Sequence, residues 1–364
     1  PQPWGCAPDG HDGCYINIKA RFIKDTLFDM NFPDTMEPEQ AKEELIAHLK
    51  ENEVLCEGPR SWTVGYSTLG GRGVFASRDI ERNELIFIDV PLIIGPKCVG
   101  KNLQMCVCCY KNDCPLFPCD RGCGLPVCSV ECENSPKHAD RECKYLKMLG
   151  PTCGTDWSLD LLLAVVPVRT MFMTERQRLL FVFCFLSFHA ICFTSIPTDL
   201  KLMKRVCDVF NTNAFETVNV QDKDHSSSLR GLYPVGALQN HCCVPNTRHH
   251  FDGKHRLHVS AVSPISAGDE LTMSYTSLFW DTTLRRQFLS ATKHFSCMCK
   301  RCSDPTEFGS RLGALLCASD NCSGYLLPKN PLQMGSPWIC DKCSTTVNNR
   351  QVLTHPYKFC MQSI

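Results

Sequence analysis

The chain has 364 residues, enough for two or three domains and a sizeable hydrophobic core. Its 38 Lys and Arg residues are balanced by 38 Asp and Glu residues, so net charge does not direct it to nucleic acid or to a membrane surface. The 27 cysteines are an odd number and fall mostly in CxxC-like groups, which favours metal binding in a reducing compartment over the alternative of a secreted disulfide protein.

The N-terminal part begins at Pro1 rather than Met, so a targeting segment cannot be judged. Apolar residues at helical spacing predict a helix at 39–50. Its apolar stripe consists of Ala41, Leu45, Ile46 and Leu49. Short strands are predicted next, at 62–64, 73–76 and 84–90, with prolines 91 and 96 ending the run.

Eight potential metal ligands then lie between Cys106 and Cys143. Their order is Cys106-x2-Cys109, Cys119-x3-Cys123, Cys128-x3-Cys132 and His138-x4-Cys143. Two tetrahedral zinc ions need eight such ligands, with bonds of about 2.3 Å to sulfur. The segment has no long apolar run, so zinc would supply its folding free energy, on the order of 10–16 kcal/mol per site. Cys108 and Cys114 have no assigned role, and the choice between Cys108 and Cys109 stays open, although the x2 spacing favours Cys109.

Helical sequence follows at about 158–192 and near 198–210. The longest apolar run, Leu179–Phe193, has 15 residues, whereas a membrane span needs about 20, so it predicts a buried core helix. Strands return between Gly231 and Tyr275, including 255–262 and 270–275.

Two more cysteine groups close the chain. The first is Cys297-x-Cys299-x2-Cys302. The second, Cys317-x4-Cys322 with Cys340-x2-Cys343, has the four-ligand spacing of a zinc ribbon, with free thiols as the alternative.

Three segments and one aromatic residue have a specific order along the chain. They are the glycine-rich turn GGRGVF at 70–75, NHCCVPN at 240–246, GDELTMSY at 268–275, and Phe295 before the third cysteine group. In this order they resemble the SET domain of protein lysine methyltransferases. With the double-zinc segment inserted after the first, the chain is similar to the SET and MYND (SMYD) family. The sequence LPVCSVECENSPKHADREC at 125–143 and the cysteines after Cys302 resemble most its arthropod-type members.

The resemblance implies an α+β fold. A knot-like SET-domain β fold would be split by a MYND double-zinc insertion and a helical insertion, and closed by a cysteine-rich post-SET zinc site and a zinc ribbon. The implied segments are an N-terminal extension (1–60), the SET N-terminal part (61–100), the MYND zinc finger (104–143), the helical SET insertion (144–225), the SET core (226–280), the post-SET zinc segment (281–303), a zinc-ribbon-like segment (304–345) and the start of a C-terminal region (346–364). Family members usually continue into a C-terminal helical domain that would complete a substrate groove.

The resemblance also implies S-adenosylmethionine (SAM) as cofactor and assigns site residues. The implied SAM contacts are Arg72, Gly73, Asn213, Asn240, His241, Tyr275 and Phe295, with Asn213 the weakest match and Phe295 stacking on the adenine. Tyr275 would close the active site, and Tyr233 would line the lysine channel. Cys243 would join Cys297, Cys299 and Cys302 in a third zinc site. Cys242 stands where the family motif NHSCxPN has Ser.

Simpler interpretations apply to the same residues. Arg72 would also suit a solvated turn, His241 a hydrogen-bonded core position, and Tyr275 the end of a strand. Tyr233 would also suit plain packing, and Asn213 the end of a helix or strand.

Methyl transfer from a sulfonium to an amine is an in-line displacement, so positioning is most of the catalysis. Free lysine has a pKa of about 10.4, and both burial and a neighbouring positive charge lower it. Tyr275 would orient the amine without a dedicated base, and its hydroxyl would hold the methyl group by weak CH···O contacts.

The resemblance implies a protein-lysine N-methyltransferase of the nucleus and cytoplasm, acting on histone or non-histone proteins. The alternative is a weak or inactive scaffold in transcriptional repression whose MYND segment binds proline-rich peptides. Direct nucleic-acid binding is disfavoured, because residues 106–143 carry four Lys and Arg against six Asp and Glu. No membrane partner is expected.

Overall fold

The computed structural model describes residues 36–55, 58–97, 105–148, 159–185, 208–220 and 226–348. The chain divides into two compact units. The first unit comprises Pro1–Cys56, Ile88–Ala237 and His250–His258, and the second comprises Glu57–Phe87, Leu238–His249 and Val259–Ile364. Most of the predicted N-terminal extension, the later half of the apolar run 179–193 and most of the predicted helix 198–210 lie outside the described residues.

The first unit begins with α1 (Pro38–Glu51), which confirms the helix predicted at 39–50. Its buried residues are Ala41, Leu45, His48 and Leu49. Ile46, predicted to share that stripe, is only half-buried. Arg176 on α6 (Glu175–Phe185) donates a hydrogen bond of 2.8 Å to Glu44, which ties the two helices together.

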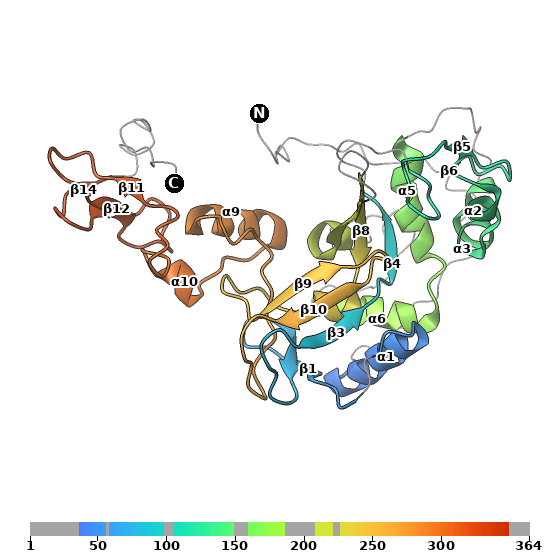
Figure 1. Cartoon of the computed structure of the whole chain (residues 1–364), viewed down its shortest axis with the longest axis horizontal. Helices are drawn as coiled ribbons and strands as arrows, with labels where there is room; N and C mark the ends of the chain where they lie inside the picture. Colours follow the sequence, from blue (N-terminus) through green and yellow to red (C-terminus); the bar gives the residue numbers. More distant parts are fainter. Residues whose placement is uncertain are drawn as a thin grey trace, which may run out of the picture. The chain divides into compact units, whose positions relative to one another are not determined.

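The first unit contains an antiparallel sheet of three strands, in the order β4-β8-β7. The strands are β4 (Ile93–Pro96), β8 (Ser226–Leu232) and β7 (Phe215–Val220). Helix α5 (Leu159–Thr170) packs against β4 (Figure 1). The predicted strand 84–90 ends at Asp89, before Pro91, and β4 ends at Pro96, which confirms both prolines as strand ends. Pairing in this sheet begins after Pro91, where Leu92 N–H donates to Leu232 O at 2.8 Å.

Within its described part, residues 159–185, the helical sequence predicted at 158–192 forms two helices, α5 and α6, separated at residues 171–174. Leu180, Phe181, Phe183, Cys184 and Phe185 of α6 are buried, as expected of a core helix. Within the described ranges, no helix is both long enough and apolar enough to cross a membrane.

The segment with eight potential ligands has little regular structure. Its elements are β5 (Phe117–Pro118), β6 (Pro126–Val127), α2 (Val130–Asn134), α3 (Pro136–His138), the π-helical turn η1 (Ala139–Cys143) and α4 (Lys144–Met148). Cysteine side chains form much of its buried core, together with Val107, Leu125 and Val127.

The second unit contains a hairpin of β1 (Trp62–Tyr66) and β2 (Arg72–Ala76), which confirms two predicted strands. Gly71 in the connecting turn has a φ of +58°, a conformation that favours glycine. The strand predicted at 270–275 was wrong. This segment instead pairs with two different partners: Leu271 N–H donates to Val74 O, and Met273 N–H donates to Asn240 O.

A second three-stranded sheet has the order β3-β10-β9 (Figure 1). Its strands are β3 (Leu85–Asp89), β10 (Leu257–Ala261) and β9 (Thr247–Phe251). The boundaries between the two units fall within these strands. The predicted strand 255–262 corresponds to β10, which begins two residues later because His255, at a φ of +59°, still belongs to the preceding turn.

The rest of the second unit is cysteine-rich. Helix α9 (Thr282–Lys293) is capped by Asp281, which accepts a hydrogen bond of 2.8 Å from Leu284 N–H. Helix α10 (Lys300–Ser303) follows. A four-stranded antiparallel sheet of β11 (Leu315–Leu316), β12 (Tyr325–Pro328), β13 (Trp338–Cys340) and β14 (Thr346–Val347) then forms, as expected of a ribbon.

Candidate cofactor site and metal centres

Four groups of cysteine and histidine side chains each place their ligand atoms within 4.8 Å of one another. They are Cys106, Cys109, Cys128 and Cys132; Cys119, Cys123, His138 and Cys143; Cys243, Cys297, Cys299 and Cys302; and Cys317, Cys322, Cys340 and Cys343. All sixteen residues were named from the sequence as potential ligands, and the structure shows which pairs of the 106–143 segment come together. Tetrahedral zinc with bonds of about 2.3 Å requires sulfur atoms about 3.8 Å apart, and the distances below fit that requirement.

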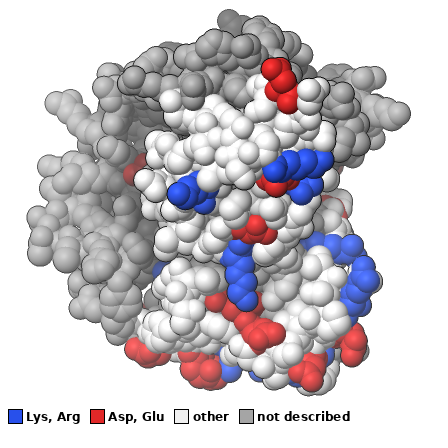
Figure 2. All heavy atoms as spheres, turned by 90° about the vertical axis from the view of Figure 1, so that its left-hand side faces the viewer, with Lys and Arg blue, Asp and Glu red and all other residues white. Residues whose placement is uncertain are grey.

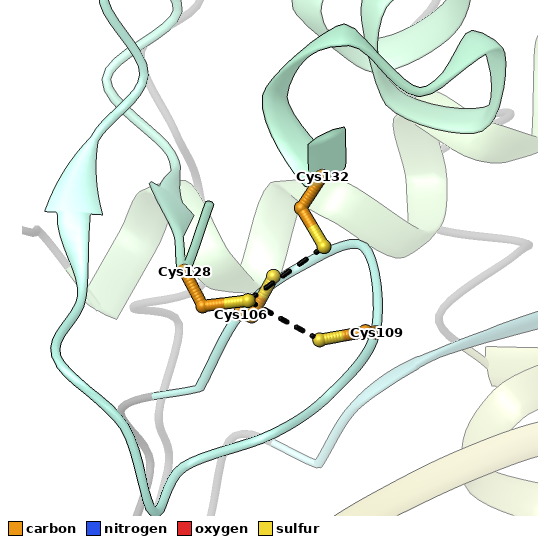
Figure 3. A group of neighbouring side chains, drawn as sticks. All are labelled: Cys106, Cys109, Cys128 and Cys132. Atoms are coloured by element: carbon orange, nitrogen blue, oxygen red, sulfur yellow. Dashed lines mark hydrogen bonds between the residues drawn. The ribbon is translucent and has the colours of Figure 1, made fainter. Parts of the chain in front are cut away.

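The first cluster is drawn in Figure 3, where the four side chains point toward one another. Cys128 Sγ lies 3.5 Å from Cys109 Sγ and 3.6 Å from Cys132 Sγ. Cys109 belongs to the cluster and Cys108 does not, which answers the question left open by the sequence.

The second cluster is buried and contains the one histidine among the predicted ligands. His138 Nε2 lies 3.4 Å from Cys119 Sγ, whereas Nδ1 lies 3.6 Å from the buried carboxylate of Glu142. Arg169 donates to the same Glu142 oxygen at 2.6 Å. His138 Nδ1 and Glu142 Oε2 have no hydrogen-bond partner among the described residues. A carboxylate beside the second nitrogen of a ligand histidine is the usual means of fixing its tautomer.

The third cluster joins segments far apart in the sequence. Cys243 Sγ lies 3.9 Å from Cys297 Sγ and 3.5 Å from Cys302 Sγ. The fully buried Arg285 donates from Nε to Cys243 Sγ at 3.3 Å, and Glu307 accepts from its Nη1 at 2.7 Å. Sequence reasoning missed both residues, since neither stands in a recognisable motif.

The fourth cluster holds the ribbon sheet together. Cys317 Sγ lies 3.6 Å from Cys343 Sγ, and Cys322 Sγ lies 3.6 Å from Cys340 Sγ. A Cβ on Gly324 would lie only 2.5 Å from Cys340 Sγ, so glycine is required there.

Three aromatic rings of the second unit lie close together. The His241 ring centroid is 5.3 Å from that of Tyr275 and 5.9 Å from that of Phe295, and the last two are 6.5 Å apart. Phe295 is 37% exposed, so part of its ring surface is accessible to a stacking partner.

The glycine-rich turn is tied to this group through Asn240. Its amide donates to Arg72 O at 2.9 Å and to Glu270 Oε1 at 2.7 Å. With both amide protons used, Oδ1 is left as the hydrogen-bond acceptor of this side chain. A Cβ on Gly73 would lie 2.6 Å from Glu270 Oε1, so Gly73 is needed for the approach of this carboxylate. Sequence reasoning missed Glu270, although it stands inside the GDELTMSY segment.

Tyr275 is oriented by its hydroxyl, which donates to Gln239 O at 2.6 Å. Burial raises the pKa of Tyr275 above its ordinary value, so the phenol is neutral at pH 7. The ammonium of Lys293, in the last turn of α9, lies 5.7 Å from the Tyr275 ring centroid.

A family model described as SET domain matches residues 71–276, more than half of the chain. The SET domain-containing protein SmydA-8 of Drosophila melanogaster is 37% identical in isoform B, over 78% of this chain and 66% of that protein. Isoform A is 34% identical, over 84% of this chain and 69% of that protein. The chain belongs to the SET and MYND (SMYD) family, and it is similar to arthropod-type members.

More distant SMYD relatives include the N-lysine methyltransferase SMYD2 of Mus musculus, 27% identical over 64% of this chain and 58% of that protein. The chain spans about two thirds of the length of the two Drosophila proteins.

Two residues implied by the SMYD resemblance lie in the first unit and not with the group around Tyr275. Tyr233 is fully buried, and its hydroxyl donates to His255 O at 2.6 Å. Asn213 Nδ2 donates to Val209 O at 3.3 Å, as a helix-end amide does. Their channel and cofactor roles stay predictions.

Charged side chains of both signs are mixed on the one face that Figure 2 shows. On the face shown in Figure 2, the Lys and Arg side chains of the described residues are interspersed with Asp and Glu side chains. This pattern differs from the continuous basic patch that releases counterions from nucleic acid.

Proposed function

We propose that this protein is a SAM-dependent protein-lysine N-methyltransferase acting on histone or non-histone proteins of the nucleus and cytoplasm. The observation that carries the proposal is the meeting of Tyr275, His241 and Phe295 beside Asn240, which is bonded to the turn at Arg72. Two relatives support the reaction class, since mouse SMYD2 is named an N-lysine methyltransferase and mouse SMYD3 a histone-lysine N-methyltransferase.

The bound cofactor would supply an electrophilic methyl group on a sulfonium. Asn240 Oδ1 would accept from the ammonium group of SAM, and the exposed part of Phe295 would stack on the adenine. The hydroxyl proton of Tyr275 is donated to Gln239, so lone pairs on Oη are directed to accept a hydrogen bond from the substrate amine. The neutral phenol would orient that amine and would not act as its base.

The substrate lysine must lose a proton before it can react. Lys293 would place a second positive charge near Tyr275, and a like charge lowers the pKa of an arriving ammonium. Lys293 would thereby favour the neutral nucleophile.

The four clusters would each bind one zinc ion, two in the MYND segment, one in the post-SET segment and one in the ribbon. Sulfur–sulfur distances of 3.5 to 3.9 Å support this proposal. In the third site, Cys243 would connect the metal directly to the segment that contains Asn240 and His241.

The test is incubation with labelled SAM and a mixture of histones and cell extract. The unmodified protein should transfer label, and Tyr275→Phe should reduce the rate by roughly 10²-fold while keeping SAM affinity within about threefold. Equal transfer by both proteins would overturn the role of Tyr275. If calorimetry detects no SAM binding while a proline-rich peptide binds residues 104–143, the scaffold interpretation replaces the enzyme.

A further inference from the structure

Both ring nitrogens of the buried His241 have partners within the protein. The backbone N–H of Tyr275 donates to Nδ1 at 3.0 Å, and Nε2 lies 3.2 Å from Cys243 Sγ. Because Nδ1 accepts, the single ring proton is on Nε2 and points at the sulfur of Cys243.

Cys243 is one of the four cysteines of the third cluster. Two other sulfur atoms of the cluster lie 3.5 and 3.9 Å from its Sγ, and Arg285 Nε–H donates to it at 3.3 Å. Two N–H donors on one sulfur suit a thiolate much better than a thiol, because the hydrogen bonds are then charge-assisted. A metal-bound thiolate fits this environment.

The His241 imidazole lies where the backbone hydrogen bonds between residues 240–242 and Met273 end. Residues 240–242 and Met273 exchange two backbone hydrogen bonds, Met273 N–H to Asn240 O at 3.0 Å and Cys242 N–H to Met273 O at 2.9 Å. Two residues later, the amide of Tyr275 uses the His241 ring as its acceptor. The ring therefore fixes the backbone from which the Tyr275 side chain projects.

We propose that His241 is a positioning residue, which ties the backbone N–H of Tyr275 to the metal-bound thiolate of Cys243. Its side chain would act on methyl transfer through Tyr275, and would not donate a hydrogen bond to the cofactor. The link to Tyr275 catalysis rests on the proposed function, whereas the link to the metal does not.

Three substitutions separate the two hydrogen bonds. His241→Asn keeps an acceptor near the position of Nδ1 but removes the donor to Cys243. His241→Gln keeps a donor near the position of Nε2 but removes the acceptor for Tyr275. His241→Phe keeps an aromatic ring and removes both bonds. A residue needed only for packing would tolerate Phe best.

The hydrogen bond from His241 to Cys243 is tested by two measurements. These are zinc transfer to a chromogenic chelator and the sulfur-to-metal charge-transfer band of the cobalt-substituted protein. His241→Asn and His241→Phe should weaken zinc retention at one site by about 10-fold to 100-fold and shift that band. His241→Gln should stay nearer the unmodified protein in both measurements.

The hydrogen bond from the Tyr275 backbone N–H to His241 is tested by kcat and by the amide proton resonance of Tyr275. His241→Gln and His241→Phe should lower kcat by about 10²-fold with a smaller change in KM for SAM, and should move that resonance upfield. His241→Asn should lose less kcat than His241→Phe.

The proposal is overturned if His241→Phe keeps zinc retention, the charge-transfer band and the Tyr275 resonance of the unmodified protein. If the unmodified protein transfers no methyl group, the proposed function fails. The zinc, cobalt and resonance measurements still decide whether His241 links Cys243 to Tyr275.

Discussion

The third cysteine cluster uses the chain differently from the two MYND clusters. In the first unit, the two MYND clusters take all their ligands from Cys106–Cys143 and form the core of that segment. In the second unit, the third cluster joins Cys243 to Cys297 and Cys302, which are 54 and 59 positions away. A local cluster stabilises its own segment, whereas a distant one closes a loop of chain, here the loop that contains Tyr275.

The buried charges beside the clusters differ as well. The second cluster has a carboxylate, Glu142, next to its histidine ligand, and the third has a guanidinium, Arg285, next to its thiolates. A zinc-bound histidine has an N–H to donate, whereas four thiolates around one zinc carry a net charge of −2 and need donors. Each of these buried charges forms a salt bridge with a residue of opposite charge: Glu142 pairs with Arg169, and Arg285 pairs with Glu307.

The largest effect is expected from removing a distant ligand. Cys243→Ser should lose one zinc per chain, with metal-binding free energy on the order of 10 kcal/mol, and should lose SAM binding with it. Cys322→Ser, in the ribbon, should also lose one zinc but keep SAM affinity. Zinc content by mass spectrometry and SAM binding by calorimetry compare the two. Loss of SAM binding in both variants would contradict a special role for the third cluster.

A smaller effect is expected from breaking the Arg285–Glu307 ion pair beside the third cluster. Glu307→Ala leaves the buried Arg285 and Arg301 without their carboxylate, which should cost about 3–5 kcal/mol of unfolding free energy. Arg311→Ala removes a half-exposed pair with Asp341 and should cost less than about 1 kcal/mol. Urea unfolding in zinc-containing buffer measures both. Similar costs would mean that Glu307 is solvated in solution.

Substitution of the buried carboxylate in the first unit, Glu142, should have a smaller effect, limited to zinc binding by the second cluster. Glu142→Gln should weaken zinc retention in the second cluster by about 10-fold to 100-fold, because the amide supports the ligand histidine less well. Chelator competition measures the loss, and calorimetry should show unchanged SAM affinity. A fall in SAM affinity would show that the two kinds of cluster are not independent.

The smallest effect is expected at Cys108, which lies outside the first cluster. Cys108→Ser should keep the zinc content of the unmodified protein, and Cys109→Ser should lose one zinc per chain. Zinc content after dialysis distinguishes the two. If Cys108→Ser also loses zinc, the two cysteines exchange as ligands.

Much of this molecule follows from residues that are close in the sequence. Ligand pairs with two to four residues between them predicted the MYND ligands and the ribbon cluster, and apolar spacing predicted α1. The strand predicted at 270–275 failed for a physical reason. Alternating apolar residues indicate one buried face, but do not say that the segment pairs with two different stretches of backbone.

The sequence by itself determined the local metal sites, because ligands on one short turn have few ways to avoid sharing an ion. Only the tertiary structure decided the contacts of Asn240 with Arg72, 168 positions away, and of Ser67 with Glu270, 203 positions away. It also decided the tie from Tyr275 through His241 to Cys243. Such contacts depend on how distant strands cross, and no spacing rule along one chain encodes that crossing.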